Sequence, residues 1–118
     1  VDEVICGFGR CGDWFASHRL GIRPDIVTMA KAMTGGYAPM GAVAVKPEIV
    51  DALPVLRHVH TFSGHAGAAA AANAAIAIMR RDGLIERGRD LGAYMLDALT
   101  QAIGDHPIVG QVRGLGMW

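Results

Sequence analysis

Net charge is absent from this sequence of 118 residues, because 11 Lys and Arg are balanced by 11 Asp and Glu. A balanced chain lacks the positive footprint that nucleic acid or an anionic membrane surface requires, so we expect neither as a partner. Only 19% of the residues are charged and 52% are hydrophobic, which excludes a disordered segment. The 16 glycines are scattered without a period, which excludes a collagen-like repeat and indicates tight turns.

Cysteine and long apolar runs are also scarce. Cys6 and Cys11 form neither a CxxC pair nor half of a zinc ribbon, and we interpret them as free thiols in a reducing, cytoplasmic compartment. The longest uncharged apolar run, residues 66–79, is mostly alanine and is too short to span a bilayer. The chain begins without methionine in one apolar segment and ends in another, which favours an internal piece of a longer protein.

Apolar runs separated by Gly and Pro predict strands that alternate with helices, the pattern of an α/β fold with a mainly parallel sheet. The predicted strands cover residues 1–6, 26–30 and 42–45, and extended segments begin near 107 and 115. The predicted helices cover residues 14–20, 47–53, 66–80 and 84–103. The uninterrupted apolar run at 26–30 is typical of a strand buried on both faces. The alanines of residues 66–75 indicate a helix packed very close to its neighbour.

Lys31 is one of only two lysines and directly follows the predicted strand 26–30. Such a lysine is either a functional amine or a strand-end residue whose charged head reaches solvent. A dry site favours the neutral amine that Schiff-base chemistry requires. Spacing alone favours the second interpretation.

Asp2 also lies at the end of a predicted strand. In a parallel sheet Asp2 and Lys31 would face the same carboxyl edge, where ligands bind. The carboxylate could pair with a cationic ring nitrogen, cap a helix or bind a metal. Together with Lys31 it suggests pyridoxal phosphate, which needs an imine-forming lysine and an acid for its pyridinium nitrogen.

The segment before the alanine-rich helix carries hydroxyls and imidazoles. Thr61 and Ser63 are candidates first for the helix N-cap and second for phosphate binding. Three histidines nearby invite a metal interpretation, but neither an HExxH motif nor a Cys/His cluster accompanies them, so we expect no metal. The glycines of residues 7–12 match neither a Walker motif nor GxGxxG and are interpreted as a turn.

Four segments, in order along the chain, resemble motifs of the class III aminotransferases. They are DEVICGFGR at 2–10, PDIVTMAKAMTGGYAPMGA at 24–42, HTFSGH at 60–65, and VG with VRGLG at 109–116. Three segments, CGFGR at 6–10, WF at 14–15 and GYAP at 36–39, are most similar to the ω-transaminases that use pyruvate as amino acceptor. Cys11, Ala32 and Ala66 replace the usual Thr, Gly and Pro of these motifs.

The resemblance implies fold type I of the pyridoxal-phosphate enzymes, usually a homodimer with its active site at the interface. It implies that Lys31 forms the Schiff base, that Asp2 pairs with the pyridinium nitrogen and that Val4 packs on the cofactor ring. Thr61 matches the hydroxyl that binds the phosphate of the partner subunit's cofactor, and His60 falls near that phosphate.

The same resemblance implies that residues 1–83 belong to the large cofactor-binding domain. Residues 84–118 would then form a linking helix and the start of the small C-terminal domain. The expected reaction transfers an amino group from an amine or ω-amino acid to a keto acid such as pyruvate. Two alternatives remain open: an aminomutase or dialkylglycine decarboxylase on the same scaffold, or a non-catalytic structural segment. We expect this segment alone to be inactive.

Overall fold

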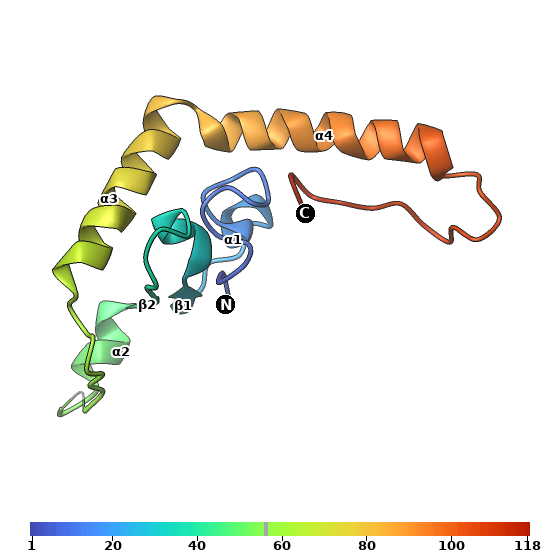
Figure 1. The fold of residues 1–118 in the computed structure, drawn as a ribbon. Helices are drawn as coiled ribbons and strands as arrows, with labels where there is room; N and C mark the ends of the chain where they lie inside the picture. Colours follow the sequence, from blue (N-terminus) through green and yellow to red (C-terminus); the bar gives the residue numbers. More distant parts are fainter. Residues whose placement is uncertain (56) are drawn as a thin grey trace.

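The computed structural model describes residues 1–55 and 57–118. Two long helices meet at an angle, and most of the shorter elements lie in the corner between them (Figure 1). The elements in chain order are α1 (Ala16–Arg19), β1 (Ile26–Met29), the 3₁₀ helix η1 (Lys31–Thr34), β2 (Ala42–Val45), α2 (Pro47–Asp51), α3 (Ala66–Arg81) and α4 (Leu84–Ile103). Strands and helices therefore alternate in the α/β manner that the sequence predicts. No helix within the described residues is long and apolar enough to cross a membrane.

The sheet of the described residues has two strands. β1 and β2 pair antiparallel, with Ile26 opposite Val45. The predicted parallel pairing is present as a single bridge between Asp2 and Thr28, in which Glu3 N donates to Thr28 O at 2.9 Å. β1 is half exposed rather than buried on both faces, because among the described residues its main packing partner is β2 and no helix packs closely over its faces.

The predicted strand at residues 1–6 is wrong. Only Asp2 makes a bridge, and the chain turns from Val4 onward. Gly7 N donates to Glu3 O at 2.9 Å and closes the first turn. Gly9 has a φ of +100°, which glycine adopts without a Cβ clash. The glycines that we interpreted as a turn therefore end the extended segment earlier than its apolar residues indicate.

The helices follow the sequence prediction closely where glycine separates them. α4 has the predicted limits, and α3 extends one residue further, to Arg81. Gly83, with a φ of +60°, separates the two helices. α1 is shorter than predicted, because it begins at Ala16 rather than at Trp14 and ends at Arg19, before Gly21 with its φ of +67°. α2 ends at Asp51, two residues before the end of the predicted helix 47–53.

The alanine stripe of α3 packs against η1, as the sequence predicts. Ala68 and Ala72 are buried on α3, and Met33 and Thr34 are buried on η1. Methyl side chains let the two backbones approach closely, which explains why so much alanine gathers in one helix. α3 therefore fixes the position of the turn that begins with Lys31.

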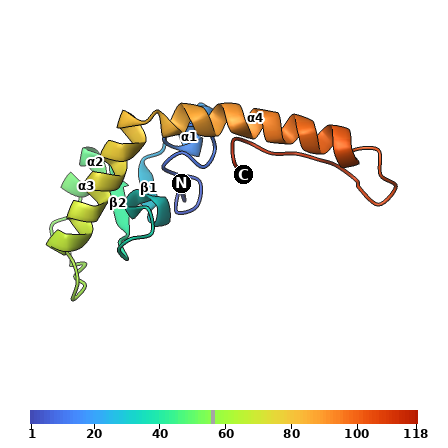
Figure 2. The same ribbon diagram turned by 45° about the horizontal axis from the view of Figure 1, so that its top comes forward.

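The C-terminal segment returns along α4 and ends against the loop of residues 8–12 (Figures 1 and 2). Met117 N donates to Arg10 O at 2.8 Å, and Arg10 Nη1 donates to Met117 O at 3.4 Å. The predicted strand beginning at 115 is wrong: Trp118 N donates to Leu115 O at 3.3 Å, which closes a turn there.

Three glycines make this approach possible, and we call them the glycine junction: Gly12, Gly92 and Gly116. A Cβ on Gly92 would overlap the carbonyl of Gly116. A Cβ on Gly116 would lie 2.5 Å from the backbone nitrogen of Gly12. Three backbone segments from the two ends of the chain and from α4 therefore stack without side chains between them.

Candidate active site

Lys31 begins η1, directly after β1. Its φ is +48°, in the left-handed region that residues other than glycine rarely adopt. Such a conformation costs on the order of 1–3 kcal/mol and gathers at functional sites. The preceding residue, Ala30, is fully extended, with φ −164° and ψ −151°. The backbone thus changes from strand to tight helix within one residue, and Lys31 occupies that corner.

The side chain of Lys31 is exposed in this chain. Within the described residues, this exposure agrees with the interpretation that spacing alone favours, a strand-end lysine whose charged head reaches solvent. β1 is itself half exposed, so its end carries no protein cover. An exposed amine is free to reach a ligand that approaches the end of β1.

Asp2 is held beside the same strand. Its Oδ1 accepts hydrogen bonds from Val4 N at 2.9 Å and from Thr28 Oγ1 at 3.2 Å. These bonds, together with the backbone bridge, hold the Asp2 carboxylate next to Thr28 of β1. Thr28 lies three residues before Lys31 in the sequence. Within the described residues both side-chain bonds use Oδ1, so Oδ2 is available to a ligand. Val4 is half-buried in the turn that follows.

Glu3, which the sequence analysis missed, caps a helix in the role we considered for Asp2. The Glu3 side chain is fully buried, and its two oxygens accept from Ser17 N at 2.7 Å and Ala16 N at 3.0 Å. These are the free amides of the first turn of α1, whose own N-cap residue, Phe15, offers no acceptor. In the sequence, the lack of a capping side chain at Phe15, directly before α1, was the signal that a distant residue caps this helix. Because Glu3 is anchored, its neighbour Asp2 points the other way.

Thr61 lies in an exposed turn before α3. Ser63 N donates to His60 O at 3.0 Å, and Ser63 Oγ accepts from His60 N at 3.2 Å. The N-cap of α3 is His65, whose Nδ1 accepts from Ala68 N at 3.1 Å. The N-cap interpretation of Thr61 and Ser63 is therefore wrong.

The turn with Thr61 lies apart from Asp2 within one chain. Figures 1 and 2 place residues 57–65 at the outer end of α3, away from α4, whereas the N-terminal segment lies beside β1. The structure thus brings Asp2 and Val4 to β1, which leads into Lys31, and leaves Thr61 and His60 elsewhere.

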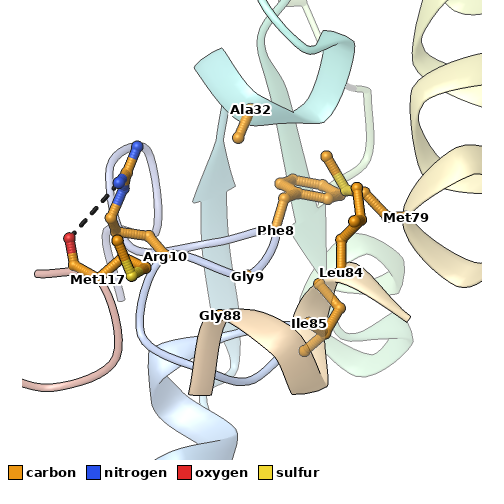
Figure 3. A pocket seen from close by; sticks show the side chains of 9 residues that line it. All are labelled: Phe8, Gly9, Arg10, Ala32, Met79, Leu84, Ile85, Gly88 and Met117. Carbon is orange, nitrogen blue, oxygen red and sulfur yellow. Dashed lines mark hydrogen bonds between the residues drawn. The ribbon is translucent and has the colours of Figure 1, made fainter. Parts of the chain in front are cut away.

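A cavity of about 220 Å³ lies behind this corner, between the loop of residues 8–10, η1 and the junction of α3 with α4 (Figure 3). Ala32, which follows Lys31, lines it, together with apolar side chains such as Phe8, Met79 and Ile85. None of the four predicted site residues lines it. The cavity is therefore not the place where the predicted site residues Lys31, Asp2, Val4 and Thr61 meet.

Both cysteines are free thiols, as predicted. Burial raises the pKa of Cys11 to about 11, and the neighbouring Cys6 thiol and Glu3 carboxylate add to the rise. Cys11 therefore stays protonated and poorly nucleophilic at neutral pH. Its position supports a packing role in the loop of residues 8–12.

A comparison with protein families matches residues 1–118 to the model described as aminotransferase class-III. The chain belongs to the class-III aminotransferase family. It is 44% identical to diaminobutyrate–2-oxoglutarate transaminase of Halomonas elongata, over 99% of this chain and 26% of that protein. It is 47% identical to putrescine–pyruvate aminotransferase of Pseudomonas aeruginosa, again over 99% of this chain and 26% of that protein.

Solved structures of the family share this fold. An aminotransferase of Bacillus anthracis superposes with a TM-score of 0.93 at 44% identity, over 98% of this chain and 27% of that one. An (S)-enantioselective ω-transaminase of Thermomicrobium roseum gives 0.91 at 43% identity, over 98% and 26%. The expected fold class, part of a fold type I enzyme, is therefore confirmed. The chain spans about a quarter of the length of these relatives.

Proposed function

We propose that the protein containing this chain is a pyridoxal-phosphate-dependent aminotransferase that moves an amino group from an amine or ω-amino acid to a keto acid such as pyruvate. The observation that carries the proposal is the strained, exposed Lys31 at the end of β1, beside the anchored carboxylate of Asp2. The names of two relatives, putrescine–pyruvate and taurine–pyruvate aminotransferase, support an amine donor and pyruvate as acceptor.

The donor set of this chain fits the cofactor. Pyridoxal phosphate presents an aldehyde, a pyridine nitrogen and a phosphate, which call for an amine, an acid and a hydroxyl. Lys31 supplies the amine, Asp2 supplies a carboxylate oxygen with no bond to the described residues, and Thr61 supplies the hydroxyl. When bound, the cofactor withdraws electrons from the substrate carbon that must lose a proton.

Each residue would then have a defined role. Lys31 would hold the cofactor covalently through Nζ and, when free, would carry a proton at that atom. Asp2 would hold a proton on the ring nitrogen through Oδ2, while Oδ1 stays bonded to Val4 and Thr28. Val4, half-buried in the turn that follows Asp2, would contact the ring.

The distance of Thr61 from this corner favours a homodimer. Thr61 binds the phosphate of the partner subunit's cofactor, with His60 near that phosphate, and the active site is shared across the interface. In this cytoplasmic enzyme, residues 1–83 belong to the large domain, and residues 84–118 form a linking helix and the start of the small C-terminal domain.

Borohydride reduction of the full-length holoenzyme, followed by peptide mapping, tests the proposal. The expected result is a single pyridoxyl label on Lys31. Lys46, the other lysine of this chain, is the internal control, because it is engaged with Asp25 at the surface. A label on Lys46, or on a lysine outside this chain, contradicts the proposal. Assays of amino transfer to pyruvate, carbon dioxide release and intramolecular transfer separate a transaminase from a decarboxylase or an aminomutase.

Asp2→Asn in the full-length enzyme should retain cofactor binding and lose most turnover. Asparagine keeps an oxygen for Val4 and Thr28 but lacks the negative charge that holds the ring proton. Cofactor occupancy by absorbance and single-turnover rates measure the two effects separately. A turnover close to that of the parent enzyme would remove Asp2 from the site.

Thr61→Ala should weaken cofactor affinity more than it slows the chemical step. A hydrogen bond to a charged phosphate contributes about 1.5–3 kcal/mol, so the dissociation constant should rise at least tenfold. Thr100→Ala, which removes an exposed hydroxyl on α4 bonded to Leu96 O, is the matched control. Cofactor titration of the two apoenzymes measures the difference, and equal affinities would leave Thr61 without a phosphate-binding role.

A further inference from the structure

Glu3 connects elements that are separate in the sequence. Its side chain is fully buried, and its two oxygens accept hydrogen bonds from Ser17 N at 2.7 Å and from Ala16 N at 3.0 Å. Two amide donors on two carboxylate oxygens suit the ionised form, which only accepts. The Glu3 backbone is also fixed, because its N donates to Thr28 O and its O accepts from Gly7 N, both at 2.9 Å. Glu3 therefore ties α1 to β1 and to the turn between them.

The position of the Asp2 carboxylate depends on the backbone of Glu3. Asp2 Oδ1 accepts from Val4 N at 2.9 Å, a bond across two residues that encloses Glu3 in an Asx turn. This bond requires suitable backbone angles at Glu3. Consecutive side chains of an extended segment point to opposite sides. With Glu3 directed to α1, the carboxylate of Asp2 lies on the other side, where it accepts from Thr28 Oγ1 at 3.2 Å.

Capping of α1 does not by itself explain a buried glutamate at position 3. Phe15, the N-cap residue of α1, has no side-chain acceptor, and Ser, Thr, Asp or Asn there would satisfy a free amide locally. Burial of an ionised carboxylate is unfavourable unless hydrogen bonds compensate for it. The distant carboxylate does one thing that a local cap cannot do, which is to hold the residue next to Asp2.

We propose that Glu3 is a positioning residue for the cofactor site, which fixes the Asx turn of Asp2 by anchoring it to α1. The inference rests on the proposed function, because Asp2 is the residue that would meet the cofactor ring. Glu3 faces α1 and acts through Asp2 alone. Loss of the anchor should therefore slow the chemical step and leave the affinity for the amine donor unchanged.

Two substitutions in the full-length protein remove the anchor in different ways. Glu3→Gln keeps the shape of the side chain but replaces one acceptor oxygen with an NH2 group, which only donates. Ala16→Pro keeps the charge of Glu3 and deletes only the donor at 3.0 Å. Proline fits there, because Ala16 is the first residue of α1 and Phe15 before it is extended, with φ −138° and ψ 144°. Ala16→Gly is the matched control, since it weakens α1 but keeps the N–H that Glu3 binds.

Hydrogen exchange of the apoenzyme is the first readout and needs no cofactor. Exchange at the Val4 amide, which donates to Asp2 Oδ1, should be about tenfold faster in Glu3→Gln and Ala16→Pro, and unchanged in Ala16→Gly. A glutamate that only caps α1 would change exchange at Ser17 and leave Val4 as in the parent, which would overturn the proposal. A change at Val4 in Glu3→Gln alone would also overturn it, because the lost charge would then be the cause.

Steady-state kinetics of the holoenzyme give the second readout. In both anchor variants kcat should fall about tenfold or more while KM for the amine donor stays at the parent value, and Ala16→Gly should match the parent. Equal kcat in all four proteins would overturn the positioning role. If Glu3→Gln does not fold, Ala16→Pro carries both readouts. If the parent holoenzyme shows no pyridoxyl label on Lys31, the proposed function fails, whereas exchange at Val4 still decides whether Glu3 positions Asp2.

Discussion

Lys31→Ala in the full-length enzyme is expected to abolish transamination and the covalent cofactor linkage while the fold survives. One nitrogen atom serves as both anchor and proton carrier, so a single substitution removes both functions. The fold survives because the exposed side chain contributes no packing. Cofactor absorbance should lose the band of the linked form, and the rate should fall by several orders of magnitude, on the scale of losing a covalent catalyst.

Two companion variants sharpen this result. Lys46→Ala should retain activity, because it removes only an exposed ion pair with Asp25, worth about 1 kcal/mol or less. Lys31→Gly should be as inactive as Lys31→Ala, yet it relieves the left-handed strain at φ +48°. Residual activity in Lys31→Ala above a few per cent of the parent would contradict the role of the lysine.

Gly92→Ala is expected to destabilise the protein even though alanine is the better helix former. In an open helix the change stabilises by about 1 kcal/mol. At Gly92 the new methyl group overlaps the carbonyl of Gly116, a backbone atom that cannot rotate away. Overpacking of this kind costs about 1–3 kcal/mol or more, so the net free energy of unfolding should fall.

Gly88→Ala, one turn earlier on α4, is the matched control. Its Cβ would lie 3.4 Å from Gly9 O, an ordinary contact, so helix propensity should dominate and the protein should gain stability. Thermal unfolding of the full-length variants measures both changes. Hydrogen exchange should accelerate at residues 10–12 and 114–118 only in Gly92→Ala. A Gly92→Ala protein as stable as Gly88→Ala would show that the glycine junction does not constrain the fold.

The helices were predictable because neighbouring residues in the sequence determine where each helix begins and ends. The Asp82–Gly83 break and the glycine at 104 stand in the sequence itself, and α4 has the predicted limits. Lys31 could be singled out because it is one of only two lysines and directly follows an apolar run, and Asp2 because, together with Lys31, it fits one cofactor. The family followed from four ordered motifs, and the match over the whole chain confirms it.

The wrong predictions concern features of the structure that are determined by contacts between residues far apart in the sequence. Glu3 caps a helix 13 residues away, a relation visible only after the chain has folded back. Thr61 and Ser63 carry the usual capping hydroxyls, yet His65 stands at the first turn and captures the amide of Ala68. The apolar run 26–30 indicated burial on both faces, which depends on helices packed over the sheet, and within the described residues no helix packs closely on β1.

The glycine junction also sets an order of events during synthesis. Arg10 and Met117, which it brings together, are separated by 107 positions in the chain. Chains leave the ribosome from the N-terminus, so the loop with Arg10 emerges long before the segment that covers it. Contacts of such long range form late, after the local turns of α3 and α4. The backbone of Cys11 and Gly12, which Gly116 approaches closely, therefore stays uncovered until residues 114–118 have left the ribosome.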